Sequence, residues 1–169
     1  MYINTETERL RIRPINLIDA EFMIDLVNSE GWLKFIGDRN ISNLTDARNY
    51  IQKILDTPNF YYNVFELKES RKAIGVVTFL NREDEKYPDF GFALFPEFEN
   101  NGYAMEASRS YLKMIEDSKE YDTIIAITKP DNQKSISLLQ KLGFHYIGDR
   151  EKGEEILSYY SSRNSKKVS

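Results

Sequence analysis

Residues 96–107 have the sequence PEFENNGYAMEA, in which a polar turn separates two segments of regular pattern. The residues before the turn predict a strand from Asp89 to Phe95, bounded by Pro88 and Pro96. The residues after it recur at helical spacing and predict a helix from about Tyr103 to Ser118. The stretch therefore predicts a strand, a tight turn and a helix in direct succession.

This turn has the chemistry of an anion site as well as that of an ordinary loop. The first amide N–H groups of a helix lack intrahelical acceptors and carry partial positive charge. Asn100, Asn101 and Gly102 are residue types that readily adopt the left-handed backbone, in which successive N–H groups point into one concavity. From the residues alone, a plain polar turn and a phosphate-binding turn both remain open.

The remaining pattern extends this unit in both directions along the chain. Further strands are predicted at residues 9–14, 60–67, 73–80, 123–128, 144–148 and 155–160. Further helices are predicted at residues 18–27, 32–36 and 132–142, and one more is capped by Thr45 and ends before Pro58. This order predicts an α+β fold with a mixed sheet of six or seven strands. We expect one domain over residues 1–160 and a polar tail at 161–169.

Composition limits the chemistry of the chain. The sequence has no cysteine, which excludes a disulfide, a thiolate nucleophile and a cysteine metal site. Its single histidine, His145, cannot form a His-rich metal site, so we expect no metal and a partly buried, structural His145. The 23 Lys and Arg are scattered among 27 Asp and Glu, which argues against nucleic-acid binding. Because no apolar run approaches membrane-spanning length and no signal-peptide pattern is present, we expect no membrane segment and a cytoplasmic location.

The run from Pro96 to Ala107 resembles motif A of the GNAT acetyltransferases, which has the form [Gln/Arg]-x-x-Gly-x-[Gly/Ala] and often continues as Gly-Tyr-Ala-x-Glu-Ala. Residues 132–144 resemble a second signature of the family, Asn-x-x-Ser followed by Lys-Leu-Gly-Phe. Residues 7–14, TERLRIRP, resemble the first strand of the Rim-type branch, the ribosomal-protein N-terminal acetyltransferases and their relatives. The resemblance covers about residues 7 to 160. It implies the GNAT fold: a mixed, mostly antiparallel sheet with helices on both faces and two parallel strands that splay apart in the middle.

The resemblance implies acetyl-CoA as co-substrate and an amine as acceptor. The pantetheine arm would lie between the splayed strands beside Leu94 and Phe95, with a backbone N–H near Leu94 directed at the thioester carbonyl. Asn132 and Ser135 would also contact the cofactor. The residues implied for the pyrophosphate are Glu99, Asn100, Asn101, Gly102, Tyr103 and Ala104.

The turn departs from the family pattern at two positions. Glu99 stands where the family usually has Gln or Arg, and Asn100 stands where it often has Gly. Asn tolerates the left-handed backbone, so the second change is mild. The first puts a carboxylate at a turn meant for a phosphate. Phosphate binding is therefore expected to depend on backbone N–H groups.

Two residues are candidates for proton transfer. Asp89 precedes Gly91 by two residues, where Rim-type relatives have Glu-x-Gly-Tyr, and a carboxylate beside an apolar strand has a raised pKa that suits it to accept a proton. The alternative is that Asp89 caps a turn after Pro88. Many GNAT enzymes use as acid a Tyr at the position held here by Leu139; in the Rim-type branch a Ser three after the Asn, here Ser135, takes this role. The Ser hydroxyl could instead bond a preceding carbonyl, with water as the acid.

The sequence thus predicts an N-acetyltransferase that moves an acetyl group from acetyl-CoA directly to a primary amine, either a peptide N-terminus or a small molecule. No covalent intermediate is expected, because no cysteine nucleophile is available. The alternative is a non-catalytic CoA-binding or regulatory domain of the same fold. Trp32 and Phe35 lie on early helices that border the acceptor entrance in this fold, and either line an amine pocket or pack in the core. Monomer and homodimer both remain open.

Overall fold

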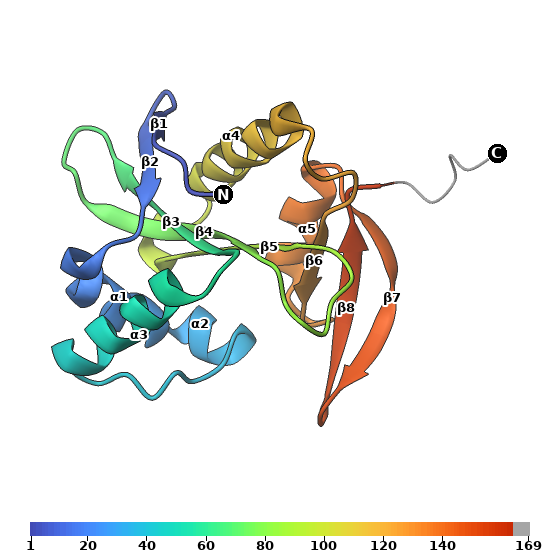
Figure 1. The fold of residues 1–169 in the computed structure, drawn as a ribbon, viewed down its shortest axis with the longest axis horizontal. Coiled ribbons are helices and arrows are strands. Elements are labelled where there is room, and N and C mark those ends of the chain that lie inside the picture. Colours follow the sequence, from blue (N-terminus) through green and yellow to red (C-terminus); the bar gives the residue numbers. More distant parts are fainter. Residues whose placement is uncertain (164–169) are drawn as a thin grey trace.

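A mixed sheet of eight strands runs through residues 1–163, the part of the chain that the computed structural model describes (Figure 1). The strand order is β1-β2-β3-β4-β5-β6-β8-β7, and every neighbouring pair is antiparallel except β5 and β6. The strands are β1 (Thr5–Glu6), β2 (Leu10–Pro14), β3 (Phe60–Leu67), β4 (Ala73–Leu80), β5 (Asp89–Leu94), β6 (Ile125–Thr128), β7 (His145–Lys152) and β8 (Glu155–Ser161).

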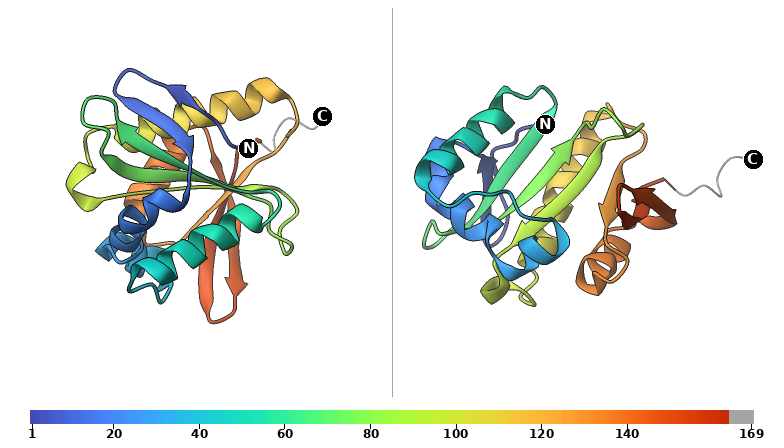
Figure 2. Two further views of the ribbon diagram at one scale, coloured as in Figure 1. Left: turned by 60° about the vertical axis from the view of Figure 1, so that its left-hand side comes forward. Right: turned by 90° about the horizontal axis from the view of Figure 1, so that it is seen from below.

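Helices cover both faces of this sheet (Figure 2). One face carries α1 (Ala20–Val27), α2 (Glu30–Phe35) and α3 (Leu44–Asp56), and the other carries α4 (Tyr103–Ser118) and α5 (Gln133–Lys141). Short 3-10 helices precede α1, at Leu17–Asp19, and follow β5, at Pro96–Phe98. The apolar residues of the chain accordingly form two buried clusters, one on each face.

Side chains of β5 alternate between the two faces of the sheet and contribute to both buried clusters. Phe90 packs with Tyr111 of α4 and with Phe144, with ring centroids 6.5 and 5.9 Å apart. Ala93 and Phe95 pack on the opposite face, against the cluster under α1 to α3. Successive residues of a strand point to opposite faces, so an apolar strand of this kind is stable only with helices on both sides.

The two parallel strands, β5 and β6, are joined at one end only. Their pairing is limited to Asp89 opposite Ile125, where the Ile125 amide donates to the Pro88 carbonyl at 2.9 Å. Beyond this point β5 stays paired with β4 up to Leu94, and β6 stays paired with β8 up to Thr128. Beyond this point the strands diverge in a V without backbone pairing between them, and this gap in the pairing is called the V-shaped opening.

The predicted α+β fold with helices on both faces is confirmed. The sheet has eight strands rather than six or seven, because Thr5–Glu6 pairs with Arg11–Ile12 and is too short to produce a sequence pattern. The third helix is capped by Asn43 rather than Thr45, since the Asn43 side chain accepts from the Asp46 amide at 2.9 Å.

The end of the chain also differs from the expectation. Ser161 closes β8, so the sheet extends into the segment predicted as a polar tail, and residues 164–169 lie outside the described residues. No helix within residues 1–163 is both long and apolar enough to cross a membrane.

Substitution of Gly75 in β4 tests how closely the sheet is packed. A Cβ at this position would lie 2.2 Å from Phe65 Cζ and 2.5 Å from the Ala93 carbonyl oxygen. We expect Gly75→Ala to lower the free energy of unfolding by about 1–3 kcal/mol, measured by urea denaturation. The control is Gly31→Ala in α2, where a Cβ meets nothing within 4 Å and helix propensity favours Ala. Equal stability of the wild type and Gly75→Ala would contradict this packing.

Candidate active site

The polar turn between β5 and α4 has the backbone of an anion-binding loop. Asn100 and Gly102 adopt left-handed conformations, with φ values of 61° and 80°, and the first intrahelical bond of α4 runs from the Glu106 amide to the Gly102 carbonyl. No hydrogen bond of normal geometry within residues 1–163 uses the amides of residues 100–104 as donors. These donors are available to a ligand.

A second element holds this turn in place. Arg9, just before β2, donates from Nη1 to the Asn101 carbonyl at 2.9 Å, and its guanidinium lies 4.3 Å from the centre of the Tyr103 ring. The Arg9 Nε also pairs with Glu106 Oε2 at 2.7 Å, and Thr7 donates its hydroxyl to the same carboxylate at 2.6 Å. The N-terminal segment therefore fixes both the turn and the first turns of α4.

Glu99 does not stand alone at the turn. Its carboxylate forms an ion pair with the Nζ of Lys134, which lies in the first turn of α5. The side chain of Glu99 is 27% exposed and that of Lys134 is 71% exposed. A cation thus accompanies the carboxylate that departs from the family pattern, and it comes from a distant part of the sequence.

The opening between β5 and β6 is lined by backbone donors of β5. The Phe95 amide points toward β4 and donates to the Ile74 carbonyl at 3.0 Å. Amides alternate in direction along a strand, so those of Phe92 and Leu94 point the other way, toward β6. Because β5 and β6 are paired only at Asp89, these amides face the V-shaped opening.

Asp89 lies at the closed end of the V, at the opposite end of β5 from the polar turn. It is 7% exposed, and Arg82 donates from Nε to its Oδ2 at 2.9 Å. Burial raises the pKa of Asp89 to about 6, although the charge and the hydrogen bond of Arg82 act to lower that pKa. The turn-capping alternative is not what the geometry shows, because the carboxylate bonds a side chain on the β4–β5 loop.

Asn132 and Ser135 lie together at the start of α5. The Asn132 side chain accepts from the Ser135 amide at 3.3 Å and caps the helix. The Ser135 hydroxyl makes no hydrogen bond with any residue in the range 1–163, so it does not bond a preceding carbonyl. Helix α5 buries Leu139 in the cluster on the α4 face.

The two candidate catalytic residues are on opposite faces of the sheet. Asp89 pairs across the sheet with Leu80, which belongs to the cluster under α1 to α3, and directly opposed residues point to the same face. Ser135 belongs to the helix on the other face. The sheet therefore separates the two residues. At roughly 3.3 Å per residue, β5 extends about 17 Å from Asp89 to Leu94, so Asp89 is also far from the wide end of the opening.

Trp32 and Phe35, which were expected either to line an amine pocket or to pack in the core, differ in burial. Trp32 is 4% exposed and packs in the cluster of α1 to α3, whereas Phe35 is half-buried. The Nζ of Lys129, at the end of β6, donates to the Lys34 carbonyl of α2 at 3.0 Å and joins the two elements. His145 is exposed at the start of β7, so the expectation of a partly buried histidine was wrong.

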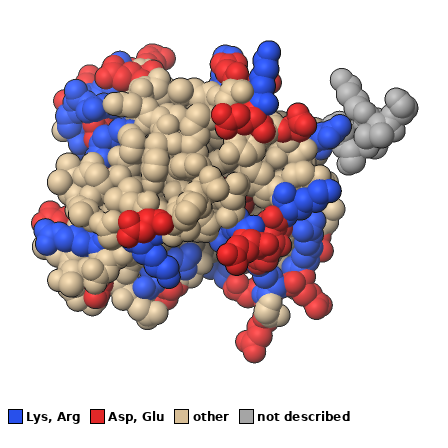
Figure 3. Space-filling model, in the orientation of Figure 1, with Lys and Arg blue, Asp and Glu red and all other residues tan. Residues whose placement is uncertain are grey.

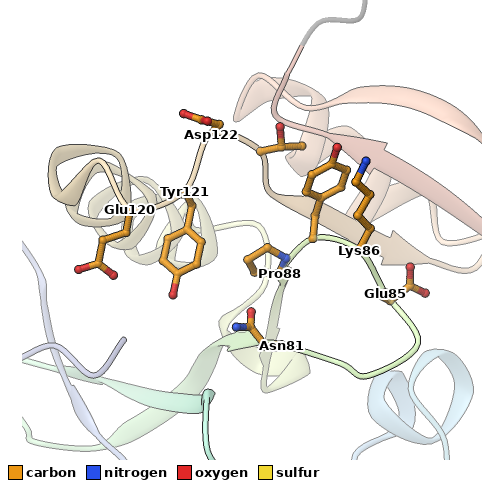
Figure 4. A pocket seen from close by; sticks show the side chains of 9 residues that line it. Asn81, Glu85, Lys86, Pro88, Glu120, Tyr121 and Asp122 are labelled. Atoms are coloured by element: carbon orange, nitrogen blue, oxygen red, sulfur yellow. The ribbon is translucent and has the colours of Figure 1, made fainter.

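A hollow of about 440 Å³ lies between the β4–β5 loop and the α4–β6 loop (Figure 4). Its lining comes from residues 81–88 and 120–123 and includes none of the predicted cofactor-binding residues. Acidic and basic side chains alternate around the face of the molecule shown in Figure 3, and the middle of that face carries few charges. No group of three or more potential metal ligands occurs within residues 1–163.

Arg82, Arg9 and Lys134 are the charged residues of this region that sequence reasoning missed. Arg9 and Lys134 fall within the quoted motifs, but no spacing relates either to its partner. Arg82 lies on a loop without any pattern.

Comparisons with known proteins agree with this geometry. The model of the acetyltransferase (GNAT) domain family matches residues 9–145. A protein named as an uncharacterized N-acetyltransferase, YnaD of Bacillus subtilis, is 25% identical over 142 residues, which cover 84% of this chain and 82% of that protein. The crystal structure of a GNAT-family acetyltransferase from Bacillus anthracis has a TM-score of 0.79 and 25% identity, covering 94% of this chain and 97% of that one.

The fold is also shared with a structure named as a ribosomal-protein-S5-alanine acetyltransferase from Vibrio fischeri. Its TM-score is 0.79 at 20% identity, covering 96% of this chain and 97% of that one. The resemblance to acetyltransferases that was read from three motifs is confirmed over most of the chain. The chain belongs to the acetyltransferase (GNAT) domain family.

Proposed function

We propose that this acetyltransferase uses acetyl-CoA as its co-substrate and transfers the acetyl group directly to a primary amine, the class that includes peptide N-termini and small-molecule amines. The observation that carries the proposal is the V-shaped opening, in which β5 and β6 pair only at Asp89 and Ile125. A strand edge with free donors is suited to the amide groups of a pantetheine arm, which pair with it as a neighbouring strand would.

The binding residues divide along the length of the cofactor. The amides of residues 100–104 hold the pyrophosphate, helped by the N-terminal end of α4. The amide of Leu94 faces the opening and stabilises the thioester oxygen as negative charge develops on it. Asn132 and Ser135, at the start of α5, are proposed to contact the pantetheine arm from the side opposite β5.

The reaction is a single displacement. The amine nitrogen attacks the thioester carbonyl, the new C–N bond forms, and the C–S bond breaks with release of the coenzyme A thiolate. Asp89 lies about 17 Å along β5 from Leu94, so it accepts the proton of the amine through a chain of water molecules, and the thiolate takes a proton from Ser135 or from water. Since the pKa of Asp89 is about 6, its carboxylate is ionised and able to accept a proton at neutral pH.

The position of Asp89 also indicates the side from which the acceptor arrives. Its side chain belongs to the face covered by α1 to α3, whereas Ser135 belongs to the other face. We therefore propose that the amine enters on the α1–α3 face and that coenzyme A departs on the α5 face. Base and acid then act on opposite sides of the reacting carbon.

A non-catalytic CoA-binding domain is the second candidate. Glu99 favours it, because a carboxylate at the phosphate turn opposes anion binding. Release of free thiol from acetyl-CoA with a panel of primary amines decides between the two. Amine-dependent release supports the enzyme, whereas binding of coenzyme A without release from any amine supports the second candidate.

Substitution of the proposed base and acid tests their roles. We expect Asp89→Asn to lower kcat/KM about 100-fold or more, and Ser135→Ala to lower it about 10-fold, because each removes one proton-transfer group. The assay is thiol release with the best acceptor of the panel, and Glu116→Gln, an exposed carboxylate on α4, serves as the control. Wild-type rates in both variants would contradict these roles but not the reaction.

Burial raises the pKa of the proposed base, and Arg82 acts to lower it. We expect Arg82→Gln to raise the pKa of Asp89 above about 6, because the charge and hydrogen bond that favour the carboxylate are lost. The pKa is measured by carboxyl ¹³C NMR titration, and the acidic limb of the pH–rate profile should move in the same direction. An unchanged pKa would show that the pair seen here does not act on Asp89.

The raised pKa of Asp89 also makes the free energy of unfolding depend on pH. Asp89 has a pKa of about 6 in the folded protein against an ordinary pKa of 3.8, so the folded state binds the proton more tightly than the unfolded state does. The contribution of protonated Asp89 to the free energy of unfolding is fully present below pH 3.8 and is lost as the pH rises through about 6. Relative to Asp89→Asn, the wild type should lose about 3 kcal/mol between these limits. Urea denaturation across the range measures this difference, and a constant difference would contradict the raised pKa.

A further inference from the structure

The V-shaped opening is bridged at its wide end by one pair of charges. Among the hydrogen bonds and ion pairs within residues 1–163, the contact between Glu99 and Lys134 is the one that joins residues 92–103 to residues 127–142. Glu99 belongs to the polar turn after β5, and Lys134 belongs to the first turn of α5. The ion pair therefore spans the two elements between which the pantetheine arm is proposed to lie.

The turn needs a positive charge that its own residues do not supply. Glu99 brings a negative charge beside the free amides of residues 100–104, and an incoming phosphate is repelled by it. Arg9, the other cation at the turn, is already engaged by Glu106, the Asn101 carbonyl and the Tyr103 ring. Lys134 is thus the cation whose only bonding partner within residues 1–163 is a carboxylate of the turn itself.

The chemistry of Lys134 allows an exchange of partners. Its ammonium group has three donors on a flexible stem, and its side chain is 71% exposed. An exposed ion pair contributes little net stability, so replacing one anionic partner by another has a low cost. A phosphate carries more charge than the carboxylate and has more acceptor oxygens, so it competes well for the same ammonium.

We propose that Lys134 is a phosphate-binding residue of the cofactor site, which Glu99 holds across the opening in the free protein and which transfers to a cofactor phosphate on binding. The inference rests on the proposed function and deepens its cofactor site. Glu99 then acts as an internal competitor of the phosphate. This pair replaces the Gln or Arg that motif A usually provides within the turn.

Isothermal titration with coenzyme A tests the proposal in four single variants of the full chain. Lys134→Ala should weaken binding about tenfold or more, because a charge-assisted bond to phosphate is lost. Lys134→Arg should retain most of the affinity, since the charge is kept. Glu99→Gln should tighten binding several-fold, because the competing carboxylate is gone. Lys113→Ala is the matched control: Lys113 is 69% exposed and pairs with Asp117 at 2.9 Å, and its loss should leave affinity unchanged.

The dependence on salt supplies a second readout. Raising the salt concentration weakens the binding of coenzyme A. This effect should be smaller in Lys134→Ala, which lacks one phosphate contact, and unchanged in Lys113→Ala. Thermal unfolding of the ligand-free variants shows whether any of them is misfolded, and all four are expected to unfold near the wild-type temperature.

Two results would overturn the inference while leaving the proposed function intact. The first is an affinity of Lys134→Ala for coenzyme A within twofold of the wild type. The second is a loss of affinity in Glu99→Gln equal to the loss in Lys134→Ala. The second result would mean that the ion pair itself, rather than the free cation, supports binding. A wild-type protein that does not bind coenzyme A would overturn the proposed function and this inference together.

Discussion

The geometry of the sheet and of the site depends on two parallel strands that pair with each other at one point only. β5 and β6 meet at Asp89 and Ile125 and then follow different partners, β4 on one side and β8 on the other. Because each strand is held by its other neighbour and by helices on both faces, the opening persists without collapse of the sheet. Backbone donors of β5 that would pair in a continuous sheet are left for a ligand.

The charges of the site are arranged around this opening rather than within it. At the wide end, Arg9 braces the left-handed turn from outside, and Lys134 faces Glu99 across the opening. At the closed end, Arg82 partly offsets the cost of burying Asp89. A positive and a negative charge are therefore paired at each end. The proposed reaction uses both pairs, one to hold phosphate and the other to accept a proton.

Local features were predictable from the sequence, and long-range contacts were not. The bounds of β3 and β4 agree with prediction, because long runs of aromatic, β-branched and apolar residues have no other stable placement. The left-handed turn at Asn100 and Gly102 follows from residue type and from the helix that comes after it. By contrast, the pairs formed by Arg9, Arg82 and Lys134 depend on how distant segments meet, and no periodicity records that. The placement of Asp89 and Ser135 on opposite faces likewise required the sheet.

Coenzyme A should occupy both the opening and the turn, and amide hydrogen exchange followed by NMR tests this occupancy most directly. On addition of coenzyme A, the amides of Leu94 and of residues 100–104 should exchange more slowly, because they gain acceptors that the free protein lacks within residues 1–163. The amide of Val77, in the middle of the paired strand β4, should show little change. Protection confined to the hollow lined by residues 81–88 and 120–123, with no change at the turn, would contradict the account.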